Sequence, residues 1–195
     1  MSTTKEWISC ADTAKLIRVA LRREFPDTKF GVRSKTYSGG ASIDIKWTDG
    51  PTRKAVEAVA KSYAGGDFDG MIDLKYYTDA WLMPDGSATP AHSAGTGGSR
   101  GVHEGYDYEP PSPDAVRVSF GADFVFCERS YSEAFARRVR DEIAAKWSRE
   151  AGDFPGVRES GCGWSLDWDH PSQYGANAGP GGCDPTRLFR DALEA

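Results

Sequence analysis

The segment Lys35–Pro51 reads KTYSGGASIDIKWTDGP and decides the fold of this chain. Its second half alternates apolar Ile43, Ile45 and Trp47 with polar residues, which is the pattern of a strand with one buried face. A phosphate-binding loop would place its glycines between a strand and a helix and would continue with Lys-Ser or Lys-Thr, which this segment lacks. Residues 29–34 alternate in the same way before the glycines. The sequence therefore predicts a β-hairpin with its turn at residues 38–40.

Amphipathic helices are predicted on both sides of this hairpin. The first follows Ser9, has an acid in its first turn at Asp12 and ends at Pro26. The second begins at Pro51 and closes before residues 65–66, which are both glycine. Apolar residues recur at helical spacing in both, namely Leu16, Ile17, Ala20 and Leu21 in the first and Val56, Val59, Ala60 and Tyr63 in the second.

The second half of the chain repeats the order strand, strand, helix. Strands are expected at residues 73–82, 116–120 and 124–128, and a helix begins at Ser132 with the apolar stripe Phe135, Val139, Ile143 and Trp147. If both sets of helices pack on one side of a shared antiparallel sheet, the fold is an α+β two-layer sandwich. We expect one domain over residues 9–151. Residues 152–195 are expected to form an irregular extension that ends in a short helix near 185–193.

One stretch inside this domain differs in composition. Residues 84–114 contain six Gly, five Pro and four Ser and almost no aliphatic side chains. Such a stretch gains little from burial to offset its ordering entropy, so we expect a mobile insertion there.

Composition restricts the function classes. The net charge of −5 makes general attraction to nucleic acid unfavourable, so any such binding needs a local basic surface. No apolar run is long enough to span a membrane, and the first residues lack the apolar core of a signal peptide, so we expect a cytoplasmic protein without a membrane partner. In that compartment the four cysteines are expected to stay reduced.

The outward face of the hairpin is the candidate binding site. Arg33, Lys35 and Lys46 should project on one side, near Tyr37, with Asp44 as the opposing charge. Cations beside an aromatic ring can bind an anionic ligand, nucleic acid or an acidic protein surface. The simpler interpretation is a solvated polar face.

Metal and catalytic chemistry have weak candidates. Cys162, His170 and Cys183, with Asp167 or Asp169 as a fourth ligand, lack the paired C-x-x-C spacing of zinc sites, so we predict no metal and no cofactor. Two of the three histidines, His92 and His103, lie in the expected insertion, where no catalytic triad would keep its geometry. We therefore predict no catalytic residues. An acid–base site at His170 remains the enzymatic alternative.

Several segments together resemble a known family. They are ADTAKLIRVALRREFPDTKFGVRSKTYSGGASIDIKWTDGPTRKAVEAVAKSY, FDGMIDL and VSFGADFVFCERSYSEAFARRV, and between Ala11 and Lys146 they resemble large polyvalent protein-associated domain 29. Such domains occur in large proteins of phages and conjugative elements and also as small separate proteins. The resemblance implies a role in establishing the incoming element, including countering host defences, and assigns no catalytic residues.

These observations lead to one expected function and two alternatives. We expect a non-enzymatic binding protein of a phage or other mobile element that counters host defence, by anti-CRISPR-like inhibition of a nucleic-acid-processing complex. The first alternative is a nucleic-acid-binding module that uses the basic hairpin face. The second is an enzyme with its site near His170.

Overall fold

The computed structural model describes residues 5–71, 73–91, 110–146, 156–160, 163–167 and 185–194. The chain divides into two compact units, one made of Met1–Trp47 with Arg53–Glu128 and the other of Thr48–Thr52 with Arg129–Ala195. Each unit has its own buried core. The described helices include none that is both long and apolar enough to cross a membrane.

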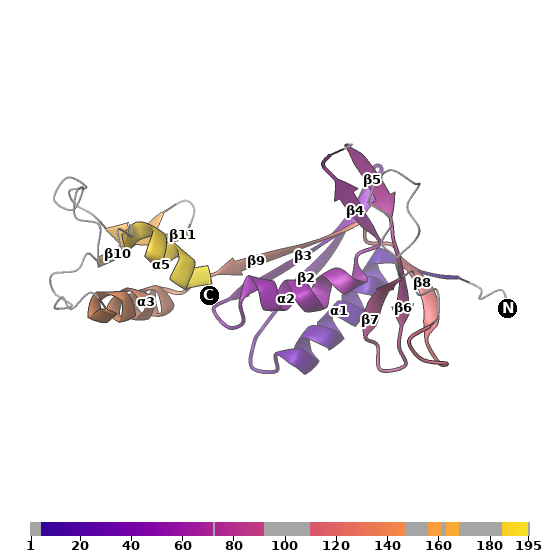
Figure 1. The fold of residues 1–195 in the computed structure, drawn as a ribbon, viewed down its shortest axis with the longest axis horizontal. Helices are drawn as coiled ribbons and strands as arrows, with labels where there is room; N and C mark the ends of the chain where they lie inside the picture. The colour runs from indigo at the N-terminus through magenta and orange to yellow at the C-terminus, as the bar shows by residue number, and fades with distance from the viewer. Residues whose placement is uncertain are drawn as a thin grey trace. The chain divides into compact units, whose positions relative to one another are not determined.

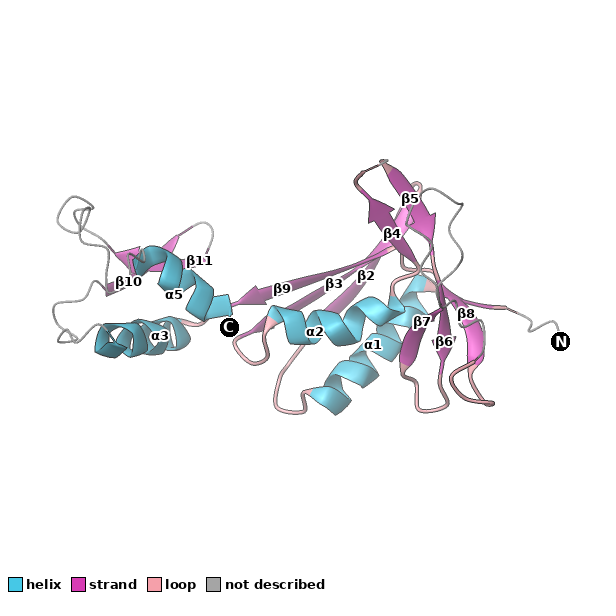
Figure 2. Cartoon of the chain, in the orientation of Figure 1, coloured by secondary structure: helices cyan, strands magenta, loops and turns pink. Residues whose placement is uncertain are grey.

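The first unit is built on a three-stranded sheet with two helices on one face. The strand order is β2-β3-β9, with β2 at Gly31–Tyr37, β3 at Gly40–Thr48 and β9 at Phe124–Ser130. Helices α1 (Cys10–Glu24) and α2 (Arg53–Ala60) lie next to each other against this sheet, as Figure 1 and Figure 2 show. A short 3-10 helix, η1 at Lys61–Tyr63, continues α2. This arrangement confirms the α+β class.

The core of the first unit follows the predicted periodicities. Ile43, Ile45 and Trp47 are buried on the helix side of β3, where they meet the buried stripe of α1. Ser9 begins α1, and its hydroxyl accepts a hydrogen bond from the backbone N–H of Asp12 at 3.1 Å. The apolar residues predicted for the two helices thus form the inner layer between helices and sheet.

The hairpin prediction is confirmed by the register of β2 and β3. Tyr37 lies opposite Gly40 and Gly31 lies opposite Lys46, so the turn contains two residues, Ser38 and Gly39. Gly39 has φ 89°, a conformation that a residue with a side chain rarely adopts. The glycine pair therefore forms a tight turn and not a phosphate loop.

A second sheet and a separate hairpin complete the first unit. The sheet has the order β1-β8-β6-β7, and the hairpin pairs β4 with β5. Their bounds are β1 Glu6–Ile8, β4 Gly66–Asp69, β5 Leu74–Tyr77, β6 Asp79–Leu82, β7 Ala88–Ala91 and β8 Val116–Phe120.

One prediction in this region is wrong, and a second, on the mobility of an insertion, stays a prediction although part of its range forms a strand. Residues 73–82 were expected to form one strand, but the chain divides at Thr78 into β5 and β6, which belong to different sheets. The backbone N–H of Thr78 donates to Gly65 at 2.9 Å, which takes this residue out of the ladder of β6. Residues 84–114 were expected to be a mobile insertion, but residues 88–91 form β7, which pairs with β6 and buries Ala91. Residues 92–109 of this stretch lie outside the described residues.

The sheets are mixed and not wholly antiparallel as expected. Strand β1 runs parallel to β8. The backbone N–H of Asp123 donates to Ala41 and that of Asp49 donates to Ser130, so the partners of β3 and β9 increase together along both strands. Strands β3 and β9 therefore also run in the same direction.

The second unit has a different composition of elements. Helix α3 (Glu133–Lys146) packs against helix α5 (Pro185–Glu194) and the antiparallel pair β10 (Gly156–Ser160) and β11 (Gly163–Asp167). Its buried residues are Ala136, Val139, Ile143, Ala144, Leu166, Phe189 and Leu193.

Three expectations bear on the second unit. The helix begun at Ser132 and the short final helix are confirmed. The expectation that α3 shares one sheet with α1 and α2 is wrong, because its apolar stripe is buried against α5, β10 and β11. Residues 156–160 and 163–167 were expected to be irregular and instead form strands. Trp147 lies outside the described residues.

Candidate functional site: the open sheet face and a cleft beside the hairpin turn

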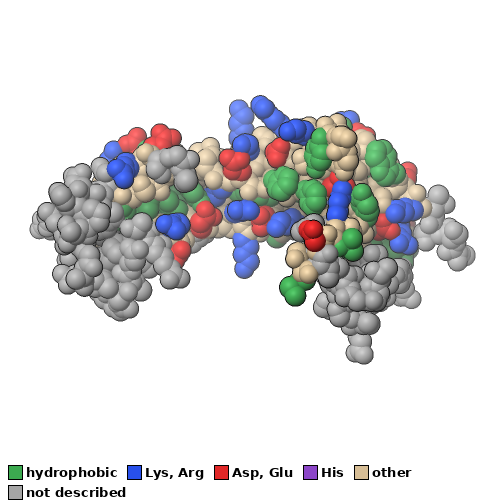
Figure 3. Space-filling view, turned by 90° about the horizontal axis from the view of Figure 1, so that it is seen from above, with side chains coloured by type: hydrophobic (Ala, Val, Ile, Leu, Met, Phe, Trp, Pro, Cys, Tyr) green, Lys and Arg blue, Asp and Glu red, His purple; other side chains and the backbone are tan. Residues whose placement is uncertain are grey.

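The predicted binding residues lie on the sheet face that α1 and α2 leave open. Arg33, Lys35 and Tyr37 occupy alternating positions of β2, and the register places Lys46 on the same face of β3. All four are exposed to solvent. Viewed from above, Figure 3 shows cationic, acidic and hydrophobic side chains mixed on this part of the surface. The structure thus brings the four predicted residues onto one face.

Strand β9 adds three residues to this face that sequence reasoning missed. The Lys46 ammonium lies 2.6 Å from a carboxylate oxygen of Glu128. The rings of Phe124 and Phe126 stack with centroids 6.1 Å apart, and Phe126 is 55% exposed. The alternation of buried Val125 and Cys127 with these residues was visible in the sequence, but the pairing of β9 with β3 was not. We call the surface formed by Arg33, Lys35, Tyr37, Asp44, Lys46, Phe124, Phe126 and Glu128 the open face.

A cleft of about 610 Å³ lies beside the hairpin turn, where β1, β5, β8 and the start of β9 meet. Its lining combines aromatic side chains, charged groups and glycine backbone. The lining residues are Lys5, Trp7, Gly39, Gly40, Ala41, Gly65, Tyr77, Ser119, Phe120, Gly121 and Asp123.

Glycines allow the segments around the cleft to approach closely. A Cβ atom at Gly65 would lie 1.8 Å from the carbonyl oxygen of Phe120, and one at Gly40 would lie 2.4 Å from Oδ2 of Asp123. A Cβ at Gly121 would lie 2.9 Å from the ring of Trp7. The glycines of the SGG, AGG and FGA motifs therefore shape this cleft, a role that their turn-like sequence context concealed.

Asp123, which lines the cleft, is fixed by two partners. Its Oδ2 accepts a hydrogen bond from the backbone N–H of Ala41 at 2.9 Å and lies 2.9 Å from the Lys75 ammonium. Lys75 Nζ also lies 4.9 Å from the centroid of the Tyr77 ring and 5.6 Å from that of Phe124. The hydrogen bond to Asp123 raises the pKa of Lys75, which keeps this cation charged. The arrangement leaves the Oδ1 atom of Asp123 without a donor among the described residues.

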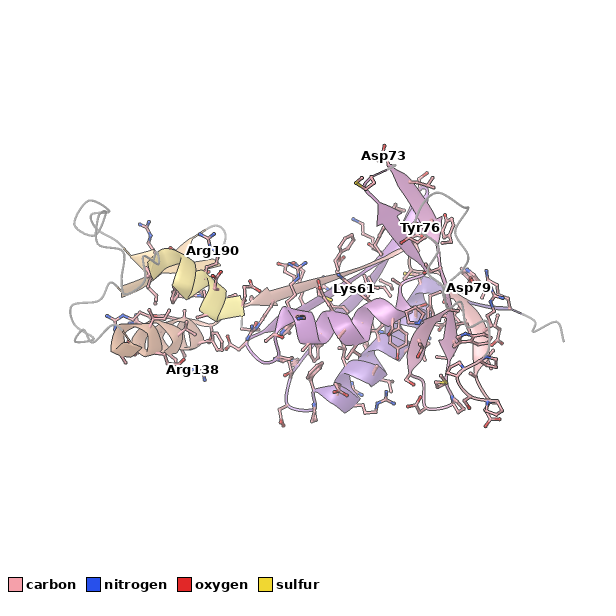
Figure 4. All side chains as sticks on the ribbon, viewed as in Figure 1. Lys61, Asp73, Tyr76, Asp79, Arg138 and Arg190 are labelled. Carbon is pink, nitrogen blue, oxygen red and sulfur yellow. The ribbon has the colours of Figure 1, made fainter. Side chains whose placement is uncertain are left out.

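A second carboxylate is Asp79, which lies at the start of β6 (Figure 4). It contacts two cations and a hydroxyl group. Lys5 and Ser119 contact its Oδ1 at 2.7 Å each, and Arg117 contacts its Oδ2 at 2.7 Å. Burial would raise the pKa of Asp79, but the hydrogen bonds from Lys5, Ser119 and Arg117 outweigh it and lower the pKa. The carboxylate therefore ties β1, β6 and β8 together beside the cleft.

The described residues offer neither a cluster of metal ligands nor a reactive thiol. No group of three His, Cys, Asp or Glu side chains among them is placed to hold a metal. Burial raises the pKa of both described thiols, that of Cys127 to about 11, which makes Cys10 and Cys127 poor nucleophiles. The other residues considered for metal or acid–base chemistry lie outside the described part of the structure, namely His92, His103, Cys162, Asp169, His170, Cys183 and the side chain of Asp167.

Comparisons with known proteins place the first unit in a family. Searches among curated proteins and among solved structures found no match. The model of the family described as large polyvalent protein associated domain 29 matches residues 8–132, which is more than half of the chain. The match ends before α3, close to the end of the first unit at Glu128, and not at Lys146 as the sequence suggested. The chain belongs to the family of large polyvalent protein associated domain 29.

Proposed function

We propose that this protein is a non-enzymatic binding protein of a phage or other mobile element, which counters host defence by occupying a protein surface of a nucleic-acid-processing complex, in the manner of an anti-CRISPR inhibitor. The observation that carries the proposal is the open face, a continuous surface on which exposed cations and aromatic rings lie together. Arg and aromatic residues are enriched where proteins bind one another. The mobile-element setting rests on the family resemblance.

The charge balance of the open face favours a protein partner over bare nucleic acid. The face carries three cations, Arg33, Lys35 and Lys46, and two acids, Asp44 and Glu128, which is a net charge of +1 (3 − 2). Nucleic-acid surfaces need several uncompensated cations because affinity depends on neutralising phosphates. A face that combines both signs of charge with exposed Tyr37 and Phe126 has the polar and aromatic composition of a protein interface.

A charge-reversal experiment tests this proposal. The variant Arg33→Glu, Lys35→Glu and Lys46→Glu is compared with the wild type in affinity purification from host lysate, and recovered components are identified by mass spectrometry. We expect the wild type to recover a component of a nucleic-acid-processing defence complex and the variant to lose it, because like charges then oppose the partner. The purified component is then titrated to confirm direct binding.

A matched variant controls for overall charge. Lys15 and Arg22 on α1 and Lys54 on α2 are exposed, and these helices cover the opposite face of the sheet. Their replacement by Glu makes the same change in net charge as the charge-reversal variant. This variant should keep the partner. Loss of the partner in both variants would contradict the proposal, because the open face would then have no specific role. Recovery of only nucleic acid, with binding that weakens steeply with salt, would favour the nucleic-acid alternative instead.

A further inference from the structure

We propose that the cleft beside the hairpin turn binds a nucleotide whose base carries an exocyclic amino group, either free or at the end of a single strand. This site adjoins the open face at the hairpin turn but uses other side chains, and it would operate whether or not that face meets a protein. The proposal follows from the size of the cleft, its two exposed rings, its carboxylate and its cation.

The cleft has the size of a small-ligand site. Its volume of about 610 Å³ falls within the range of roughly 300–1,000 Å³ that is usual for small-ligand pockets, and it is open to solvent, where Trp7 and Tyr77 are exposed. Three segments with glycine at their closest approach form its floor. Backbone hydrogen bonds fix these segments, since Gly65 donates to Ala122 at 2.7 Å and Gly121 donates to Ile8 at 2.7 Å. A fixed floor reduces the ordering entropy that binding would otherwise cost.

Two aromatic side chains line the cleft from different strands and expose most of their surface. Trp7 on β1 is 69% exposed and Tyr77 on β5 is 68% exposed. Exposure of this extent is uncommon for large aromatic residues that serve only a core. Lys75 lies against the Tyr77 ring, which holds that ring at the cleft. A planar base stacks favourably on such a ring, as bases of single-stranded nucleic acids do on aromatic side chains.

The carboxylate sets the hydrogen-bonding character of the ligand. Asp123 uses Oδ2 for Ala41 and Lys75, while Oδ1 has no donor among the described residues. A carboxylate oxygen that lines the cleft gains from an N–H donor and disfavours a carbonyl oxygen in the same place. Amino groups on cytosine and adenine supply such a donor, whereas uracil and hypoxanthine present an oxygen.

A cation at the same cleft suits the phosphate. Lys5 lines the cleft, and its side chain is 52% exposed although it also pairs with Asp79. An ammonium group has three donors, so the pair with Asp79 leaves donors for a phosphate oxygen. The ring, the carboxylate and the cation thus match the base, its amino group and the phosphate of one nucleotide.

The test compares ligands that differ by one group, because replacing Asp123 would also disturb the backbone of Ala41. Cytidine monophosphate and uridine monophosphate are titrated into the full chain by calorimetry, with adenosine and inosine monophosphates as a second pair. We expect the amino-bearing member of each pair to bind at least about tenfold more tightly, since a hydrogen bond to a charged group is lost in the other. Equal affinities within both pairs, or no binding of any of the four nucleotides and of oligocytidine, would overturn the proposal.

Variants assign the site on the protein. Trp7→Ala should weaken cytidine monophosphate binding at least about tenfold, and Lys5→Ala should weaken the nucleotide but not cytidine, which lacks the phosphate. Phe126→Ala is the control, because this ring is also exposed but lies on the open face and not in the cleft. Unchanged binding by Trp7→Ala would contradict the proposal.

Oligocytidine distinguishes the two sources of the nucleotide. If the monophosphate binds, the ligand is a free nucleotide. If only oligocytidine binds, and Trp7→Ala abolishes that binding, the ligand is the end of a single strand. The readout is independent of the proposed function, since partner recovery depends on the open face and nucleotide affinity on the cleft.

Discussion

At the scale of single residues, the packing of the first unit requires glycine where two backbone segments approach closely. A Cβ atom at Gly65 would lie 1.8 Å from Phe120 O, which is backbone and cannot move aside as a side chain can. We predict that Gly65→Ala lowers the free energy of unfolding by about 3 kcal/mol, the upper end of the usual cost of overpacking. Chemical denaturation measures it. Gly31→Ala is the control, since its new Cβ would meet only Lys46 O at 3.6 Å, and equal losses in both variants would contradict the steric explanation.

Two neighbouring residues on β3, one buried and one exposed, should differ in their contribution to stability. Trp47 is 3% exposed and packs against the Phe30 ring with centroids 5.6 Å apart, whereas Lys46 points to the open face. We predict that Trp47→Ala costs about 3–5 kcal/mol of stability through a cavity, while Lys46→Ala costs less than about 1 kcal/mol. Urea unfolding of both variants checks the difference. A similar cost for the two would show that the side chains do not divide between core and surface as described.

At the scale of elements, one carboxylate connects three strands. Asp79 on β6 binds Lys5, which directly precedes β1, and Arg117 and Ser119 of β8, and its side chain is 11% exposed. We predict that Asp79→Asn lowers the free energy of unfolding by about 2 kcal/mol at neutral pH, because hydrogen bonds to a charged group are lost. Asp27→Asn, at an exposed turn position, is the control and should change stability little.

The effect of Asp79 should depend on pH in one direction. Folding lowers its pKa from the usual value of 3.8, so the unfolded chain takes up the proton first as the pH falls. The stabilisation is therefore complete above about pH 4 and is lost below it. We expect the stability difference between wild type and Asp79→Asn to shrink on acidification, measured by denaturation at pH 7 and pH 3. A difference that stays constant would show that the charge of Asp79 does not contribute.

The elements that sequence reasoning found are those in which one periodicity continues over many residues. Strand β3 and helix α1 have such patterns, and both were predicted with their buried faces. Strand β7 was missed because its four residues, ATPA, include a proline and make only edge pairs with β6. The division at Thr78 was missed because a hydrogen bond to Gly65, distant in the sequence, ends the strand.

The site was only partly visible for the same reason. Local alternation placed Arg33, Lys35, Tyr37 and Lys46 on one face. Two other features arise from contacts between segments about 80 residues apart. Glu128 lies beside Lys46 through such a contact, and the cleft forms where Asp123 meets Ala41. No local pattern reports such contacts, and glycines that permit close packing look like turn glycines in a sequence.

At the scale of the whole molecule, two separate cores imply separate unfolding. Phe189 is 1% exposed in the core of the second unit, and Trp47 belongs to the core of the first. We predict two transitions in scanning calorimetry, of which Phe189→Ala lowers one and Trp47→Ala the other, since each creates a cavity in one unit. A single transition that both substitutions lower equally would mean that the units unfold together.

Strand β2 lies at the edge of its sheet among the described strands, and this position affects how copies of the protein behave in concentrated solution. An unpaired strand edge tends to add a strand from another molecule. Two copies that met through β2 would bring Arg33 and Lys35 of one against the same cations of the other, and their repulsion reaches about 10 Å at 0.1 M salt but only about 3 Å at 1 M. The charges of this strand therefore oppose self-association in dilute buffer, and concentrated salt removes that protection.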